Sequence, residues 1–338
     1  MTPQPQSPQH TGHAPVMITE VLDALPAHSE KGLVVDMTFG GGGYTKEILE
    51  HTQYDVLALD RDPDAIARGE DLKSQFPERL HLVQTVFSKV DEALVKAGLA
   101  AEAEVASGHG VVDAVVLDLG VSSFQIDQPE RGFSFSANGP LDMRMGTEGK
   151  TAAEIVADYD ESQLADIFWR FGEEKLARRM AGAIVSARKE KPIQETGQLA
   201  RVIHSVRPRR HFDRTDPATR VFQALRIEVN DELGEIERAL DKAKNLLRPG
   251  GVLVVVSFHS LEDRIVKKLF NTLAGKPKHQ NKYQHLSSQE GPRHEAYDFR
   301  LPYRGVMKPT KEEQQVNPRA RSGRMRVLQK KGERENET

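Results

Sequence analysis

The sequence contains no cysteine and a single tryptophan, and aromatic residues make up only 6% of its 338 residues. Without cysteine there is no disulfide framework, no thiolate metal site and no cysteine nucleophile. No apolar run approaches the ~20 residues that cross a membrane. The polar, proline-rich start differs from a signal peptide. We therefore expect a cytoplasmic protein with no membrane partner and a disordered lead over residues 1–12.

The sequence also lacks a strong excess of either charge, since its formal net charge is −3 at pH 7. Basic residues nevertheless gather in two stretches, 201–220 and 300–334. Such stretches can neutralise the phosphates of a nucleic acid. A solvated basic surface explains each stretch equally well, so charge alone leaves the partner open.

The first half of the chain alternates between strand and helix patterns. Apolar runs predict strands at 33–36, 56–60, 80–86 and 111–119, and the segments between them predict helices at 46–50, 63–76 and 89–97. Repeated βα units build a doubly wound parallel sheet, whose ligands bind beyond the carboxyl ends of the strands. We therefore expect an α/β fold with its functional site at that edge.

The alternation stops after Gly120, where a loop rich in turn residues leads into helical patterns. Thr151 is a candidate helix N-cap, helical spacing resumes at 219–247, and a buried strand is predicted at 252–258. The sheet domain is thus expected to be split by a helical insertion. The expected domains are a first part of the sheet domain (13–125), an inserted substrate-recognition domain (126–216), a second part with a basic tail (217–330) and a disordered end (331–338).

Residues 275–297 are polar and predict a flexible surface loop. The histidines of this segment lack the spacing of metal ligands. We therefore expect no metal site.

The stretch 34–45 carries the clearest functional pattern. An apolar run ends on Asp36, turns through four glycines from Gly40 to Gly43 and enters a helical segment, and the next apolar run ends on Asp60. This is the plan of a nucleotide-binding βαβ unit, in which glycine lets the backbone turn tightly against a ligand. The alternative is that the glycines only allow a tight turn and contact no ligand.

The same stretch distinguishes between two adenosine-bearing cofactors. The dinucleotide fingerprint requires glycine where this chain has Thr45, so the pattern favours S-adenosylmethionine over NAD. Asp36 suits the ammonium of that cofactor, the N–H groups from Gly40 onward suit its carboxylate, and Asp60 suits the ribose hydroxyls.

Ten segments of the sequence match motifs of a known protein family. They are His13-Ala-Pro-Val16, Asp36-Met-Thr-Phe-Gly40, Leu59-Asp-Arg-Asp62, Leu117-Asp-Leu-Gly-Val-Ser-Ser123, Glu130-Arg-Gly-Phe-Ser-Phe135, Gly139-Pro-Leu-Asp-Met-Arg-Met145, Pro217-Ala-Thr-Arg220, Phe222-Gln-Ala-Leu-Arg226, Ser257-Phe-His-Ser-Leu-Glu-Asp-Arg264 and Asn317-Pro-Arg-Ala-Arg-Ser322. On these segments the chain closely resembles the ribosomal RNA small-subunit methyltransferase H family, also called MraW. The resemblance covers residues 13–327.

The resemblance implies a class I S-adenosylmethionine-dependent methyltransferase sheet with a helical insertion. It implies N4-methylation of a cytidine in the decoding centre of small-subunit ribosomal RNA, at position 1402 of 16S rRNA. It also assigns cofactor contacts to Gly42, Gly43, Tyr44, Asp60, Phe87, Asp118 and Gln125. Family members commonly have histidine where this chain has Tyr44, so the role of that side chain is open, whereas a backbone contact would survive the change.

Asp118, at the carboxyl end of the predicted fourth strand, is the candidate catalytic residue. Cytosine N4 is a poor nucleophile because its lone pair is delocalised into the ring, and an acceptor for its amino hydrogens would release that lone pair. The rest of catalysis is alignment of methyl group and nucleophile at about 3 Å. Phe124, Phe133 and Phe135 are candidates to stack on the base. A strand-end aspartate that only fixes the following loop is the alternative.

Three side chains are candidates for substrate contact. His259 follows the predicted fifth strand, and Arg131 and Arg144 lie in loops that flank the insertion. A histidine satisfied by local backbone groups and arginines in surface salt bridges are their alternatives. The target base must leave its stack, and the insertion and basic tail are candidate walls of an RNA channel.

Two other functions stay open on the sequence alone. One is a small-molecule methyltransferase of the same fold, and the other is a non-enzymatic RNA-binding assembly factor. A homodimer is one option for the assembly of the chain.

Overall fold

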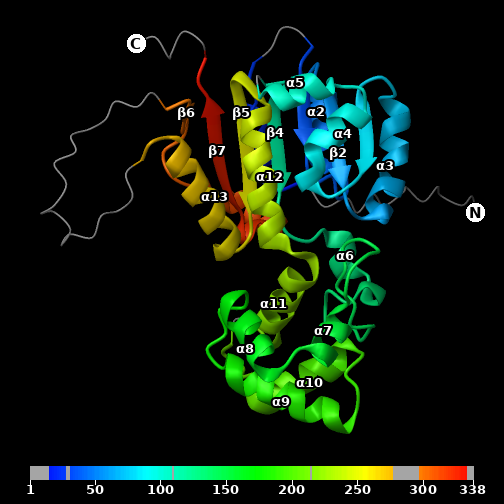
Figure 1. The fold of residues 1–338 in the computed structure, drawn as a ribbon. Coiled ribbons are helices and arrows are strands. Elements are labelled where there is room, and N and C mark those ends of the chain that lie inside the picture. Colours follow the sequence, from blue (N-terminus) through cyan, green and yellow to red (C-terminus); the bar gives the residue numbers. More distant parts are fainter. Residues whose placement is uncertain (1–14, 28–30, 109, 214, 277–296, 333–338) are drawn as a thin grey trace, which may run out of the picture.

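The structure, a computed structural model, consists of a sheet domain and a smaller body of helices below it in Figure 1. It describes residues 15–27, 31–108, 110–213, 215–276 and 297–332. The predicted disordered lead, nearly all of the predicted loop at 275–297 and most of the predicted disordered end therefore lie outside the described residues. Within the described part, no helix is long and apolar enough to span a membrane.

A seven-stranded sheet forms the sheet domain. Its strands are β1 (Leu33–Asp36), β2 (Asp55–Asp60), β3 (Leu80–Gln84), β4 (Val112–Asp118), β5 (Leu247–Ser257), β6 (Phe299–Arg300) and β7 (Arg324–Lys330). They lie in the order β3-β2-β1-β4-β5-β7-β6. The first five are parallel neighbours, and β7 is antiparallel to both β5 and β6. The predicted α/β class and class I methyltransferase-like sheet are confirmed.

Helices cover both faces of this sheet. The helices of the described residues are α1 (Ile18–Ala24), α2 (Gly43–His51), α3 (Pro63–Gln75), α4 (Val90–Lys96), α5 (Glu102–Ser107), α6 (Ser123–Asp127), α7 (Ala152–Asp158), α8 (Glu161–Arg170), α9 (Ala177–Glu190), α10 (Thr196–Val206), α11 (Ala218–Asn230), α12 (Glu232–Leu246), α13 (Ser260–Leu273) and α14 (Lys311–Val316). Apolar side chains of α4, α12 and α13 pack on one face, and those of α1, α2 and α3 pack on the other.

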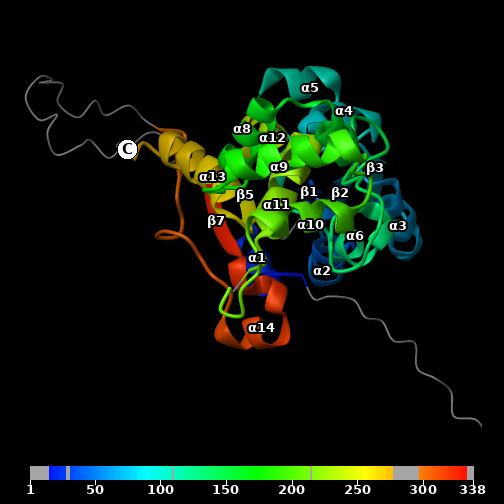
Figure 2. The same cartoon turned by 90° about the horizontal axis from the view of Figure 1, so that it is seen from below.

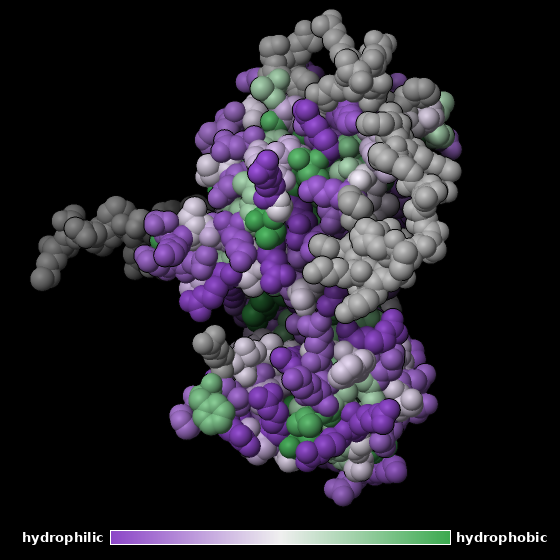
Figure 3. Space-filling view, turned by 90° about the vertical axis from the view of Figure 1, so that its left-hand side faces the viewer, coloured by the Kyte–Doolittle hydropathy of each residue, from purple (hydrophilic) through white to green (hydrophobic). Residues whose placement is uncertain are grey.

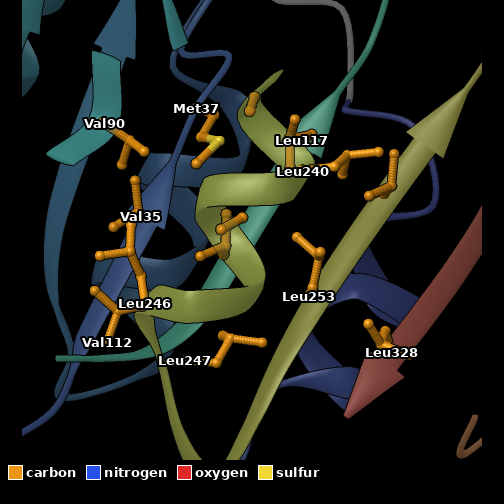
Figure 4. Close-up of a cluster of buried hydrophobic side chains, with 14 of the residues drawn as sticks. Val35, Met37, Val90, Val112, Leu117, Leu240, Leu246, Leu247, Leu253 and Leu328 are labelled. Atoms are coloured by element: carbon orange, nitrogen blue, oxygen red, sulfur yellow. The ribbon is translucent and has the colours of Figure 1, made fainter. Parts of the chain in front are cut away.

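The strands supply both faces because their side chains alternate. In β1, Val35 joins the cluster under α12 while Val34 joins the cluster under α1 and α2. Figure 4 shows the first cluster, with Leu240 and Leu246 of α12 lying over side chains of β1, β4 and β5. A sheet buried on both faces explains why the predicted strands are nearly continuous apolar runs.

The helical body has a core of its own, built from α7 to α11. Thr151 caps α7 as predicted, since its hydroxyl accepts the N–H of Glu154. Phe222 and Leu225 of α11 belong to this core, so the helical body draws on residues beyond 216, the expected end of the insertion. The helical pattern at 219–247 is two helices, which meet at Asp231 in a left-handed conformation (φ 47°).

The basic stretch that follows residue 300 is partly structural. Residues 324–330 form β7, which the sequence analysis does not predict, and Arg326 pairs with Asp263 of α13 at 2.6 Å. Further upstream, α14 lies beside the start of α1 (Figure 2), where Glu313 accepts the N–H of Met17 at 2.7 Å. Part of the basic charge of this stretch therefore holds the sheet domain together.

Candidate cofactor and substrate site

The glycine turn predicted after β1 lies at the carboxyl edge of the sheet and leads directly into α2. Gly40 (φ 55°) and Gly42 (φ 76°) adopt left-handed conformations, which favour glycine. A Cβ at Gly42 would lie 2.8 Å from the Phe39 ring, and one at Gly41 would lie 2.9 Å from the Phe124 ring. The turn is therefore restricted to glycine by its neighbours. It leads into the first turn of α2, whose N–H groups have no acceptors within the helix.

Asp36 anchors this turn from inside the protein. Its carboxylate is fully buried, and accepts the Thr38 N–H at 3.0 Å and the Thr45 hydroxyl at 2.7 Å. Burial raises the pKa of Asp36 to about 6. Thr45, the residue that departs from the dinucleotide pattern, thus donates a hydrogen bond that holds the Asp36 carboxylate. The structure shows no exposed carboxylate at Asp36, so its contact with a cofactor ammonium stays a prediction.

Asp60 ends β2 and meets the glycine turn. One of its oxygens accepts the N–H of Gly40 at 2.7 Å, and the other accepts the N–H of Asp62 at 2.8 Å. Each carboxylate oxygen has a second lone pair, and Asp60 is partly exposed. The residue can therefore hold the turn and accept hydrogen bonds from two ribose hydroxyls at once. This geometry fits the role that the sequence predicts for it.

Tyr44 points away from the site. Its ring is buried in the core on the α1 side of the sheet, and its hydroxyl donates to the backbone carbonyl of Val16. Burial raises the pKa of this phenol well above its usual value. Only the backbone of Tyr44 is available at the turn, in line with the expectation that a backbone contact survives at this position.

A small pocket lies beside these loops. Its walls come from the turns after β1, β3 and β4 and from α12 and α13, with Thr38, Phe87, Gly120, Ile236 and Glu262 among the lining residues. Phe87 lines this pocket, and its contact with the adenine ring stays a prediction.

Asp118 ends β4 and has an unused hydrogen-bond acceptor. Its N–H donates to the Thr38 hydroxyl at 2.6 Å, and Oδ1 is buried with no hydrogen-bond partner among the described residues. Burial raises the pKa of Asp118 well above its usual value, and the charges of Asp36 and Glu262 add to the rise. Buried acceptors without a donor are rare in folded proteins. A ligand N–H is the natural partner for this oxygen.

Glu262 is a site residue that the sequence analysis misses. It is fully buried and lines the pocket. Its Oε2 accepts the N–H groups of Phe258 and His259 at 2.8 and 3.1 Å, and Oε1 lies 3.0 Å from His259 Nε2 without hydrogen-bond alignment. Burial acts to raise the pKa of Glu262, but His259 and Arg226 outweigh it and hold the pKa below its usual value. The glutamate three residues after His259 is a helix-capping pattern that could have pointed to it.

The amide of Gln125 is engaged within the protein. Nε2 donates to Asp62 at 2.8 Å, and Oε1 accepts the N–H of Ser122 at 3.1 Å. The side chain thus ties the loop after β4 to the loop after β2. Its contact with the cofactor stays a prediction.

Arg131 and Arg144 are committed to internal ion pairs. Arg131 lies 3.0 Å from Asp62 and 3.1 Å from Asp64, and Arg144 holds both oxygens of Asp142 at 2.8 Å. The salt-bridge alternative therefore describes both arginines in this structure. The structure therefore gives no support to the prediction that Arg131 and Arg144 bind phosphates.

The three candidate stacking rings lie in different places. Phe124 is 39% exposed and lies against the glycine turn, with the Arg68 guanidinium 4.4 Å from its ring centroid. Phe133 and Phe135 pack against the core of the helical body, where Phe135 meets Phe222 at 4.7 Å. Of the three, only Phe124 adjoins the turn.

Three side chains of ligand type, Glu232, His259 and Glu262, have ligand atoms within 4.8 Å of one another. Glu232 is already paired with Arg226, at 2.7 and 2.8 Å. The guanidinium of Arg226 thus supplies positive charge to these carboxylates. The histidines at 279–294 lie outside the described residues, and the absence of a metal stays a prediction.

Comparison with known proteins gives a consistent set of relatives. The model of the MraW methylase family matches residues 10–331. The protein named ribosomal RNA small subunit methyltransferase H of Gluconobacter oxydans is 51% identical over 319 residues, covering 94% of this chain and 93% of that protein. Its namesakes from Granulibacter bethesdensis and Rhodospirillum rubrum are 50% and 48% identical, over 94% and 95% of this chain and 91% and 94% of their own lengths.

Proposed function

The chain belongs to the MraW methylase family, and on this basis we propose that it is a cytoplasmic enzyme that methylates small-subunit ribosomal RNA. The methyl donor is S-adenosylmethionine, and the acceptor is N4 of the decoding-centre cytidine at position 1402 of 16S rRNA. The names of the relatives support the RNA class. The N4 position and the nucleotide follow from the resemblance to this family, and the buried, unpartnered Oδ1 of Asp118 supports an acceptor for an amino group.

The residues at the sheet edge fit the proposed cofactor. When bound, S-adenosylmethionine supplies a methyl group on a sulfonium that leaves readily. Asp60 is free to accept ribose hydroxyls, the N–H groups at the start of α2 suit a carboxylate, and Phe87 offers a ring in the wall of the pocket. The carboxylates around the site favour a cationic donor by electrostatic attraction.

Asp118 would then act on the amino group of the target base. Oδ1 accepts one N4 hydrogen, which localises the nitrogen lone pair for attack on the methyl carbon. On taking the methyl group, N4 would have one proton in surplus, and Asp118 would be the group placed to receive it. In its ionised form, Asp118 would be a stronger base than an exposed aspartate, because burial raises its pKa.

Glu262 is the second acid at this place. Its Oε1 also has no aligned donor, and its charge is close enough to raise the pKa of Asp118. An amino group carries two hydrogens, and Glu262 is a candidate acceptor for the second. Its lowered pKa favours the ionised form, which accepts hydrogen bonds.

Removal of the gene tests the function directly. We expect N4-methylation of the rRNA cytidine, measured by mass spectrometry, to disappear and to return with the intact gene. Unchanged methylation would reject the proposal. Turnover of a small molecule without RNA would support the small-molecule alternative, and subunit binding without methyl transfer would support the assembly-factor alternative.

A further inference from the structure

The only tryptophan of the chain lies on the outside of the helical body. Trp169, near the end of α8, is 62% exposed, although Phe168 beside it is fully buried. The indole borders a hollow between the end of α8 and the start of α9. The exposed indole offers a large, flat apolar face, with a polar N–H at its edge, to a partner.

Three cations line the same hollow. Lys175, Arg178 and Arg179 are exposed. Within the part of the chain that the structure describes, they form no ion pair, unlike Arg131 and Arg144. Trp169, Lys175, Arg178 and Arg179 are called the Trp169 surface below.

Two acidic residues, Glu161 and Asp166, also line the hollow and neutralise only part of its positive charge. Asp166 is paired with Arg170 at 3.0 Å. Glu161 lies over Gly182 of α9, where an added Cβ would be 3.4 Å from its Oε1. The three cations of the Trp169 surface therefore remain available to an anionic partner.

A chain of contacts connects this surface to the pocket. Glu173, in the turn between α8 and α9, binds Ser260 at 3.0 Å and Arg264 at 3.1 Å at the start of α13. His259, which precedes Ser260, lies 3.0 Å from the pocket residue Glu262. Helices α8 and α13 lie on the left-hand side of Figure 1, and Figure 3 shows the molecule from that side. A hollow is visible there between the sheet domain and the helical body. The turn that leads to Lys175 is thus joined to the helix that carries the pocket residue Glu262.

We propose that the Trp169 surface binds the ribosomal RNA near the target nucleotide, with one unstacked base against the indole and phosphates at Lys175, Arg178 and Arg179. Stacking on an exposed aromatic ring, with cations along the backbone, is a general way to hold single-stranded nucleic acid. The inference rests on the proposed function and adds to it a second contact, outside the pocket.

The test uses the full-length protein and small ribosomal subunits that lack the methylation. We expect Trp169→Ala to raise the Kd for subunits about tenfold, and Trp169→Phe, which keeps a stacking ring, to stay close to wild type. The double variant Arg178→Glu/Arg179→Glu should weaken binding at least as much. It should also make the dependence of log K on log salt shallower by roughly 0.7 for each lost phosphate contact.

Two matched controls isolate the surface. Val316→Ala removes another exposed apolar side chain, and Lys31→Glu/Lys96→Glu reverses two exposed charges outside the helical body, before β1 and at the end of α4. All variants should bind S-adenosylhomocysteine like wild type, which shows that they are folded.

Equal effects of the controls and of the Trp169 surface variants would overturn the inference, and so would an unchanged Kd in both Trp169→Ala and the double arginine variant. An unchanged salt dependence in the double variant would point instead to a protein partner and would also overturn it. If wild type itself neither binds nor methylates subunits, the proposed function fails first. If wild type does both, and Trp169→Ala and the double arginine variant do so equally well, only this inference fails.

Discussion

The acids at the sheet edge and the arginines of the loops near the insertion use their charge in opposite ways. Asp118 has a buried oxygen without a hydrogen-bond partner and a raised pKa. Arg131 and Arg144, in contrast, form ion pairs with neighbouring aspartates. The arginines lie in motifs of the family, yet Arg178 and Arg179, which form no ion pair among the described residues, lie elsewhere, on α9. A charged residue in a motif therefore does not by itself indicate ligand contact, because its partners in the fold decide whether its charge is available.

Replacing Asp118 is expected to have the largest effect. Asp118→Ala should lower the rate of methyl transfer by about 10²- to 10⁴-fold, the usual contribution of a positioned proton acceptor. Its affinity for S-adenosylhomocysteine should change much less. Single-turnover methylation of small subunits and titration calorimetry measure the two quantities.

Asp113 of the same strand provides the control for Asp118. It is buried and accepts the N–H of Leu33 at 2.8 Å, away from the pocket. Asp113→Asn should lower stability and leave the methylation rate of the folded protein unchanged. Equal losses of rate in the two variants would contradict a specific role of Asp118.

Removing Arg131 tests the other side of the comparison. Asp62 is almost fully buried, and Arg131→Ala leaves its charge without the ion-pair partner. We expect the free energy of unfolding to fall by about 3 kcal/mol, measured by urea denaturation, while the Kd for small subunits stays within about twofold. A large loss of subunit affinity at unchanged stability would restore the phosphate-clamp prediction.

Asp36 predicts a pH dependence of stability. Its pKa is raised to about 6 in the folded protein from an ordinary value of 3.8, so the folded state holds this proton more tightly than the unfolded state. Its contribution to stability is therefore most favourable below pH 4 and is lost as the pH rises to about 6, by at most about 3 kcal/mol. Urea denaturation of wild type and Asp36→Asn at several pH values should show their stability difference shift toward the variant across this window. A constant difference would contradict the assignment.

Tyr44 is expected to show the smallest effect. Tyr44→Phe removes the hydrogen bond to the Val16 carbonyl and should cost about 1 kcal/mol of unfolding free energy. Cofactor affinity should not change, because only the backbone of this residue lies at the turn. A marked loss of affinity for S-adenosylhomocysteine would assign a role to its hydroxyl.

The sequence predicts the parts of the site that depend on local patterns. Asp36, the glycine turn and Asp60 follow from one βαβ unit, and Asp118 follows from the end of an apolar run. Strand β7 is harder to predict because its basic residues resemble a tail, although Arg326 has a partner on α13.

Partners that lie far apart in the sequence cannot be predicted in this way. Glu262 joins the pocket only because β5 lies beside β4 in the sheet. Arg131 meets Asp62 across 69 positions of sequence only after α6 is packed. The chemistry of each residue can be inferred from its type, but the availability of its charge depends on these long-range contacts.

Nucleoside mass spectrometry of small subunits after reaction with purified protein and S-adenosylmethionine tests the central claim most directly. Subunits should come from cells that lack the gene. We predict that wild type adds a single methyl group to cytidine N4 of the rRNA, and that Asp118→Asn binds subunit and cofactor but adds almost none. Methylation at another atom by wild type, or N4-methylation at the wild-type rate by Asp118→Asn, would contradict the account.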